Sequence, residues 1–189
     1  TVVKDETEKL KEQYGDTRRT AITAESPTDF TKEELIPHQE VVVTLSQRGY
    51  IKCIPTPTYR LQHRGGKGVT SMNIKDNDPV RHILVGDTHD VLLFFTNRGR
   101  VLSLKSYELR ADISRNTRGV PVVNVIPLSE TERVNAIVGV RSLQEEDLYL
   151  VMVTRKGGVK RVALEEISNI RRAGLIIMNL KSDDELVTA

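Results

Sequence analysis

Short apolar runs, each ending at a glycine turn, recur along the chain from residue 40 onward. Continuous runs at residues 41–45, 91–95 and 148–153 are typical of strands that are buried on both faces. Each run reaches a Ser or Thr, and a glycine preceded by a basic residue stands three positions further on. A second strand that mixes apolar and basic residues then follows. The pattern predicts three antiparallel hairpins with tight turns.

The hairpins belong to a longer internal repeat. A second glycine comes 19, 20 and 17 residues after the first, at Gly68, Gly119 and Gly174. Five residues later stands an Asn between apolar residues, and an acidic residue then precedes a last strand. Units of this length with four strands are typical of β-propeller blades. A solenoid would need shorter units or helices, and an immunoglobulin-like sandwich would not repeat its landmarks.

The predicted fold is therefore all-β, a β-propeller-like wheel of four-stranded blades preceded by a short helix. The blades are expected at about 38–88, 89–143 and 144–189, and the third stops within its fourth strand. Because three blades are too few for a familiar closed ring, we expect an incomplete part of a larger wheel. A half-wheel completed by another copy of the chain is the alternative.

The first 37 residues have a different character. Residues 1–15 are rich in helix formers, Leu10 and Tyr14 share one face, and Gly15 is a natural stop. They predict the end of a longer helical, coiled-coil arm or a frayed N-terminal helix. Residues 16–37 read as a linker in which Thr31 caps a single turn.

Basic residues gather in three windows. Residues 46–68 hold five bases and no acid, and residues 98–118 and 155–172 each hold six bases and two acids. A solvated surface usually mixes its signs, so partner binding is the expected explanation. The windows cover the same two places in each repeat, the first hairpin and the loop before the second glycine. In a radial array these places lie on one surface, which predicts a cationic rim.

A curved rim with regularly spaced charge suits the phosphates of duplex DNA and predicts sequence-tolerant, salt-dependent binding. Single-stranded nucleic acid is a less favoured partner, because its bases usually stack on aromatic side chains. The chain has no Trp and only three Phe. The rim residues predicted to bind DNA are Arg48, Lys52, Arg60, Arg98, Arg100, Lys105, Arg115, Arg118, Lys156, Lys160, Arg161, Arg171 and Arg172.

One loop stands out because it sets basic side chains among glycines that allow close backbone approach. Alone it reads as a tight turn with solvated charges, and the matching basic residues of the other repeats favour DNA binding instead. It is not a nucleotide P-loop, since Leu61 replaces the first glycine and Gly68 replaces the Ser or Thr. The loop consists of Gln62, His63, Arg64, Gly65, Gly66, Lys67 and Gly68.

With the repeats, this loop resembles the signature box of the DNA gyrase A family, whose C-terminal domain is a β-pinwheel. The sequence Tyr14-Gly15-Asp16 with Arg18-Arg19-Thr20 resembles the junction after that family's coiled-coil arm. The resemblance implies DNA binding, bending and wrapping that support ATP-dependent negative supercoiling. His63 replaces an arginine of the family pattern and is mostly neutral at pH 7. In a pinwheel, neighbouring blades also exchange a strand, which no sequence feature shows directly.

The resemblance further implies a bacterial cytoplasmic protein at the nucleoid, with the gyrase B protein and a second copy of the gyrase A protein as partners in an A2B2 assembly. ATP and Mg would be used by other domains, and catalytic residues are expected to be absent from this chain. The C-terminal domain of the corresponding topoisomerase IV protein, whose box is usually degraded, is one alternative. A propeller-type protein-interaction scaffold is another.

Other chemistry finds little support. The four histidines lack metal-ligand spacing, so no metal site is expected. Cys53, the one cysteine, lies in an alternating strand and is expected to be a small core residue. The apolar runs are too short to span a bilayer, and no membrane partner is expected.

Overall fold

A computed structural model describes residues 1–16, 20, 31, 33–59, 64, 78–109 and 117–189. They divide into two compact units, Thr1–Leu35 and Ile36–Ala189. The first unit contains helix α1 (Val2–Tyr14), in which no residue is buried. The helix ends where the Gly15 amide donates to the Lys11 carbonyl.

Three sequence repeats supply the strands of the second unit. Each repeat contributes a first, a second and a fourth strand, and the bounds of the first strands differ by at most one residue from those of the expected apolar runs. In chain order the strands are β1 (Glu40–Ser46), β2 (Tyr50–Pro55) and β3 (Val80–Asp87), then β4 (Val91–Thr96), β5 (Arg100–Lys105) and β7 (Val134–Val140), then β8 (Tyr149–Thr154), β9 (Val159–Ala163) and β11 (Leu186–Thr188).

The strand after the second glycine is short and crosses to the preceding repeat. Strand β6 (Val120–Pro121) of the second repeat pairs with β2, and β10 (Leu175–Ile176) of the third repeat pairs with β5. The sheet orders are β3-β1-β2-β6 and β10-β5-β4-β7, so each four-stranded sheet is completed by the next repeat. This is the strand exchange of a pinwheel, and it confirms the all-β, blade-like fold.

The third sheet has three strands among the described residues, in the order β11-β8-β9. Its face away from the second sheet is exposed at apolar positions, with Tyr149 51%, Val151 49% and Val159 65% exposed. By contrast every residue of β4, in the middle sheet, is buried. The difference follows from position, because β4 is covered on both faces and β8 on one.

The repeated glycines have a conformational reason. The first glycine of each hairpin has a positive φ, 85° at Gly49, 74° at Gly99 and 81° at Gly157. The second glycine does too, 80° at Gly119 and 81° at Gly174. A left-handed backbone is costly for residues with a Cβ, so both landmarks mark turns that the fold requires.

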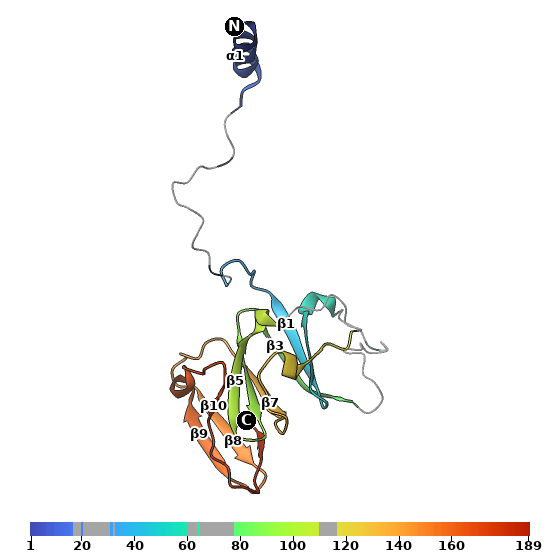
Figure 1. Cartoon of the computed structure of the whole chain (residues 1–189), viewed down its shortest axis with the longest axis vertical. Coiled ribbons are helices and arrows are strands. Elements are labelled where there is room, and N and C mark those ends of the chain that lie inside the picture. The colour runs from blue at the N-terminus through green and yellow to red at the C-terminus, as the bar shows by residue number, and fades with distance from the viewer. Residues whose placement is uncertain (17–19, 21–30, 32, 60–63, 65–77, 110–116) are drawn as a thin grey trace. The chain divides into compact units, whose positions relative to one another are not determined.

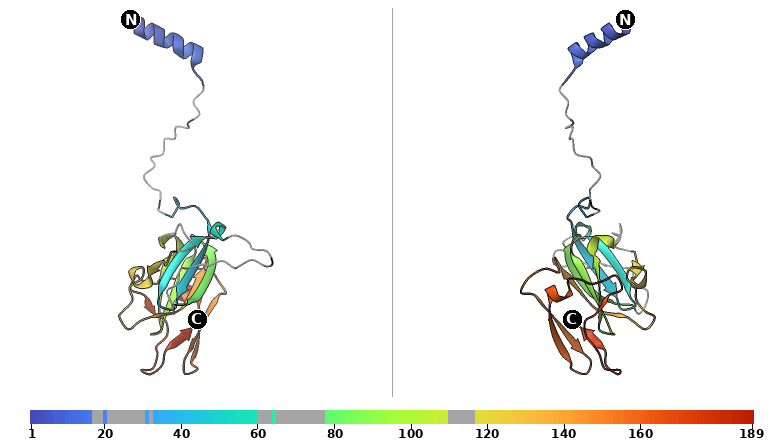
Figure 2. Two further views of the ribbon diagram at one scale, coloured as in Figure 1. Left: turned by 90° about the vertical axis from the view of Figure 1, so that its right-hand side faces the viewer. Right: turned by 60° about the vertical axis from the view of Figure 1, so that its left-hand side comes forward.

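The core lies between the sheets, which stack face against face (Figures 1 and 2). Phe94 belongs to the apolar cluster shared by the first two sheets, and Phe95 to the cluster shared by the second and third. Both phenylalanines are 0% exposed. The fourth strands contact one another in sequence, β3 with β7 and β7 with β11. They therefore form the inner edges of the sheets, and the exchanged strands β6 and β10 form the outer edges.

Short 3₁₀ turns follow several strands: η2 (Thr56–Thr58), η3 (Ser106–Glu108), η4 (Val122–Asn124) and η5 (Leu164–Ile167). Across the described residues, α1 is too short and too polar to be a candidate membrane-spanning helix, and no other α-helix qualifies.

Candidate nucleic-acid interface

The glycine-rich loop falls largely outside the described residues. Only Arg64 of its seven residues is described, and its side chain is exposed. Gln62, His63, Gly65, Gly66, Lys67 and Gly68 lie outside the described residues, as do Arg60 and Arg115 of the rim. The geometry of the interface therefore comes from the equivalent segments of the second and third repeats.

In the second repeat, the segment before the second glycine lies against the first sheet. The Arg118 guanidinium carbon stands 3.8 Å from the centre of the Tyr50 ring, a cation–π contact. A Cβ added to Gly119 would lie 2.3 Å from the Ile51 carbonyl oxygen, so only glycine permits this approach. Arg118 is thus held on the outer edge of the blade by Tyr50 of the preceding repeat.

The third repeat shows the same crossing with different cations. Arg171 and Arg172 precede Gly174, and both side chains are exposed. The Gly174 amide donates to the Arg171 carbonyl at 2.7 Å, which fixes this turn. The turn lies against the second sheet, where Arg100 Nη1 donates to the Ala173 carbonyl at 2.6 Å.

The first hairpins carry exposed cations on braced turns. Arg48 and Arg98 are exposed, and the Arg48 amide donates to the Asp78 carboxylate at 2.8 Å. In the third repeat the Lys156 amide donates to Asp184 at 3.1 Å. The acidic landmark before the fourth strand therefore braces the hairpin, which explains its recurrence. A hydrogen bond from the Thr154 side chain, together with the one from the Lys156 amide, lowers the pKa of Asp184.

Two predicted rim cations have structural partners instead. Lys52 is 2% exposed, and its ammonium donates to the Thr117 carbonyl at 2.9 Å. Placing Lys52 on the cationic rim was wrong, because the exchanged segment of the second repeat covers it. The mixed pattern of β2 could not reveal this, since the covering strand comes from a distant part of the sequence.

Arg100 is the second cation with structural partners. Its guanidinium contacts both carboxylate oxygens of Glu132 and the Pro127 carbonyl. Burial by itself would raise the pKa of Glu132, but hydrogen bonds from Arg100 and Ser129 outweigh it and hold the pKa below its ordinary 4.5. The Glu132 side chain is only 6% exposed, so Arg100 neutralises a largely buried carboxylate. Arg100 therefore contributes little net charge to the rim.

Among the remaining predicted cations, Lys160 and Arg161 keep their charge at the surface with partial anchoring. Lys105 donates to the His89 carbonyl at 3.3 Å, and Lys160 donates to the Ile177 carbonyl at 2.6 Å. Arg161 stands 4.4 Å over the Tyr149 ring, and Lys156 forms an ion pair with Asp183. Neutral carbonyl and ring partners leave the net charge of Lys160 and Arg161 in place.

Strand exchange determines which cationic segments lie side by side at the outer edges. The Val122 amide donates to the Gly49 carbonyl at 2.8 Å, and the Ile177 amide donates to the Gly99 carbonyl at 2.9 Å. Each outer edge thus combines the hairpin of one repeat with the second-glycine segment of the next. The sequence predicted a rim of equivalent positions, but it did not reveal this pairing between repeats or the tyrosine platforms under Arg118 and Arg161.

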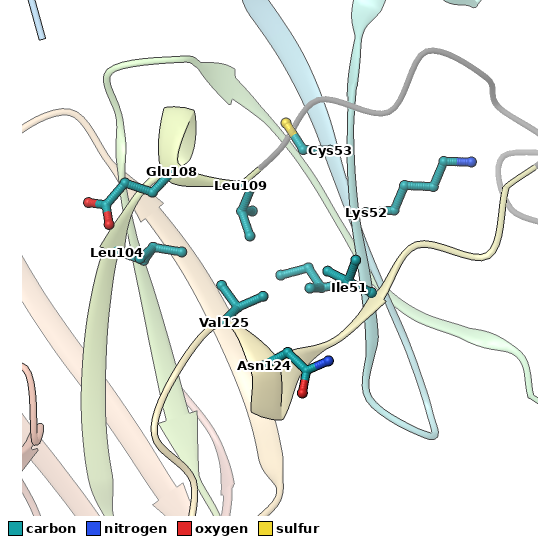
Figure 3. A pocket seen from close by; sticks show the side chains of 9 residues that line it. Ile51, Lys52, Cys53, Leu104, Glu108, Leu109, Asn124 and Val125 are labelled. Atoms are coloured by element: carbon teal, nitrogen blue, oxygen red, sulfur yellow. The ribbon is translucent and has the colours of Figure 1, made fainter. Parts of the chain in front are cut away.

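A pocket of about 450 Å³ opens between the first two sheets, and it is mainly apolar (Figure 3). Leu104, Leu109 and Val125 line it, while the Lys52 ammonium points away from it. The adjacent Cys53 is 3% exposed, which confirms its expected place in the core.

Comparisons with known proteins agree with this architecture. The family described as "DNA gyrase C-terminal domain, beta-propeller" matches residues 40–87, 90–141 and 148–189. The DNA gyrase A protein of Dehalogenimonas lykanthroporepellens is 44% identical over 188 residues, covering 100% of this chain and 23% of the relative. Its counterpart from Staphylococcus epidermidis is 44% identical over 186 residues, covering 98% and 21%. The chain thus spans less than a quarter of the length of these relatives.

Two solved structures are similar. A DNA gyrase A C-terminal domain has a TM-score of 0.63 and 27% identity, covering 79% of this chain and 47% of the other. The C-terminal domain of a DNA topoisomerase IV has a TM-score of 0.64 and 31% identity, covering 80% and 45%. The relatives, the matched residues and the exchanged strands together show that this chain belongs to the family of DNA gyrase C-terminal β-propeller domains.

Proposed function

We propose that the outer edges of the blades bind duplex DNA and bend it around the wheel, as part of a DNA gyrase A protein. The observation that carries the proposal is the recurrence of exposed arginines at the exchanged edges, with Arg48 beside the second-repeat segment and Arg171 and Arg172 beside the second sheet. The relatives, which are named as DNA gyrase A proteins, support it.

Such a surface would recognise the phosphate backbone and not the bases. Arginines that are held at the edge by a ring or by turn hydrogen bonds present their charge at fixed spacing, whereas base edges are reached only within grooves. Binding should therefore be tolerant of sequence and steeply dependent on salt. Bending a segment of 20–30 bp by 40–90° costs about 1–6 kcal/mol, which several such edges can offset.

In the whole enzyme we propose that this wrapping supports ATP-dependent negative supercoiling by an assembly of two gyrase A and two gyrase B proteins. Catalytic residues, ATP and Mg would belong to other parts of that assembly, in the bacterial cytoplasm at the nucleoid. The solved topoisomerase IV domain makes the C-terminal domain of a topoisomerase IV A protein the alternative. The relatives named as gyrase favour supercoiling.

The direct test measures DNA affinity across a salt series, with bending followed by energy transfer between dyes at the DNA ends. The variant Arg171→Ala with Arg172→Ala removes two rim charges. If each arginine neutralises one phosphate, the slope of log K against log salt should fall by about 1.8 in magnitude. Bending should weaken in the same variant.

Arg81→Ala with Arg141→Ala is the matched control. It removes the same charge from two exposed arginines, one in β3 and one directly after β7, both at the inner edges. Its salt slope should stay near that of the wild type. Equal losses in the two variants would show that net charge, and not the outer rim, governs binding, and a wild-type slope in the Arg171/Arg172 variant would refute the rim.

The glycine-rich loop is tested in the complete enzyme. Arg64→Ala with Lys67→Ala should impair wrapping and supercoiling while relaxation persists, because relaxation does not need the wrapped crossover. Supercoiling at the wild-type level in that variant would contradict the role proposed for the loop.

A further inference from the structure

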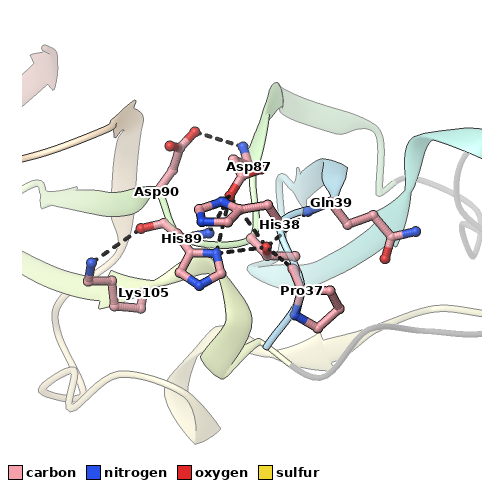
Figure 4. A network of polar contacts seen from close by, with 8 residues as sticks. Pro37, His38, Gln39, Asp87, His89, Asp90 and Lys105 are labelled. Carbon is pink, nitrogen blue, oxygen red and sulfur yellow. Dashed lines mark hydrogen bonds and ion pairs between the residues drawn. The ribbon is translucent and has the colours of Figure 1, made fainter. Parts of the chain in front are cut away.

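Two histidines and an aspartate meet at the junction between the first and second repeats (Figure 4). His38 lies just before β1, Asp87 ends β3, and His89 lies in the turn that leads to β4. His38 Nδ1 stands 2.8 Å from Asp87 Oδ1, and His89 Nδ1 stands 3.3 Å from the same oxygen. The three donor atoms lie within 4.8 Å of one another.

We propose that His38, Asp87 and His89 form a site for a divalent transition-metal ion of the zinc class. Two imidazole nitrogens and one carboxylate oxygen are a ligand set that Zn²⁺ favours, and water would complete a tetrahedron. Imidazole ligands suit Zn²⁺, Cu²⁺ and Ni²⁺, whereas Mg²⁺ and Ca²⁺ prefer oxygen. The proposal therefore concerns a metal different from the Mg of the enzyme's chemistry.

The distances are close to those that the metal requires. With bonds of 2.0–2.1 Å, neighbouring ligands of a tetrahedral zinc lie about 3.3 Å apart. The separation between His89 Nδ1 and Asp87 Oδ1 is already 3.3 Å, and the separation to His38 Nδ1 has to widen from 2.8 Å. The His38 side chain is 75% exposed, which leaves it room to turn. The rings now stack with centroids 3.8 Å apart, so the exposed His38 ring has to turn out of the stack before both nitrogens face one ion.

The backbone already fixes the segments that carry the donors. The Thr88 amide donates to the Gln39 carbonyl at 3.0 Å, and the Gln39 amide donates to Thr88 Oγ1 at 3.2 Å. Thr88 Oγ1 also donates to the Pro37 carbonyl at 2.9 Å. These bonds hold His38 beside the turn before any metal binds. Little conformational entropy remains to be lost, which favours binding.

The turn itself holds Asp87 and His89 in place. The Asp87 amide donates to Asp90 Oδ2 at 2.8 Å, and the His89 amide donates to Asp87 Oδ1 at 2.9 Å. The surrounding charges include Asp90, Glu40, Arg141 and Lys105, whose ammonium donates to the His89 carbonyl. Among these described residues, with Asp87 ionised, three acids stand against two bases, which favours a cation.

Metal binding would tie the segment before β1 to the turn between the first two repeats. The bond is local to the second unit, since all three ligands lie after Ile36. A protonated imidazole loses its Nδ1 proton to solvent as the nitrogen lone pair binds the ion, and a neutral imidazole binds it as the tautomer that carries its proton on Nε2. The expected consequence is a more rigid start of the first blade.

The test is calorimetric titration of tag-free protein with Zn²⁺, followed by Co²⁺ as a spectroscopic probe. One Zn²⁺ should bind per chain, a large excess of Mg²⁺ should not compete, and Co²⁺ should show the absorption of a tetrahedral site. His38→Ala should weaken binding by about tenfold or more, and its exposed position means that the fold should survive the substitution.

His63→Ala is the matched control, because it removes one histidine that belongs to another loop. It should keep the wild-type affinity for Zn²⁺. Zn²⁺ should also slow hydrogen exchange at the Gln39 and Thr88 amides in the wild type and the control, but not in His38→Ala. The proposal is overturned if no stoichiometric Zn²⁺ binds, or if His38→Ala and His63→Ala bind it equally.

Discussion

The strand exchange rests on Gly119, and a pair of glycine substitutions isolates its contribution. Gly119 and Gly157 have almost the same φ, 80° and 81°. A Cβ on Gly157 would meet nothing within 4 Å, whereas a Cβ on Gly119 would lie 2.3 Å from the Ile51 carbonyl oxygen. Gly157→Ala therefore reports conformational strain alone, and Gly119→Ala reports strain together with a steric clash.

The structure sets the scale of each effect. A left-handed backbone with a Cβ costs about 1–2 kcal/mol, which is the whole expectation for Gly157→Ala. In Gly119→Ala the clash is with the backbone of β2, so β6 has to move away. That movement breaks the bond from the Val122 amide to the Gly49 carbonyl, worth about 1 kcal/mol, and exposes part of the Val122 side chain. Val122 is 4% exposed, and full exposure of such a side chain costs about 1.5–3 kcal/mol.

Gly119→Ala should accordingly lower the free energy of unfolding by about 3–5 kcal/mol, roughly 2 kcal/mol more than Gly157→Ala does. Urea unfolding measures the difference: at a slope of about 2 kcal/mol per M, the two midpoints should differ by about 1 M. Hydrogen exchange at the Val122 amide should accelerate in Gly119→Ala and stay unchanged in Gly157→Ala. Equal midpoints and an unchanged Val122 amide would show that the close approach of the exchanged strand contributes nothing to stability.

Two further predictions concern buried charges. Since the folded-state pKa of Glu132 lies below its ordinary 4.5, the ionised carboxylate contributes stability that is complete above that pH and is lost as pH falls through the folded pKa. Urea unfolding from pH 7 to about 3 should therefore show a weaker pH dependence for Glu132→Gln than for the wild type, and parallel curves would contradict this account. Lys52→Met should leave DNA affinity within about twofold of the wild type, because the ammonium is already bound to Thr117 and exposes no charge to phosphate. A smaller slope of log K against log salt in gel shifts of Lys52→Met would show that Lys52 does contact phosphate.

The sequence predicted the strands well because their signals are local. The apolar run of β4 and the glycine that follows it fix a hairpin without information from elsewhere, and its residues are indeed all buried. The acidic landmark was equally visible, although its purpose was not. Only the structure shows that the Asp78 carboxylate accepts the Arg48 amide, a bond across 30 positions of sequence.

Long-range placement was beyond the sequence for a physical reason. A two-residue strand such as β6 carries no periodic signal, and the partner it pairs with lies about 70 residues earlier. Lys52 therefore looked like a surface cation although Thr117 and its neighbours cover it. Long-range placement also concealed the proposed metal site, because His38 and Asp87 are 49 positions apart and do not form a short metal-binding motif.

The strand exchange also bears on the proposed DNA-binding surface. If every blade held its own cations, deleting a repeat would remove one patch and leave the others intact. Here the Gly99 carbonyl and Arg100 of the second repeat bind the Ile177 amide and the Ala173 carbonyl of the third. Each edge is therefore shared by two repeats, and the loss of one repeat disturbs the edge of its predecessor as well. The spacing of charge along the rim is consequently set by strand pairing between repeats, so the proposed binding of a curved duplex should depend on the stability of that pairing.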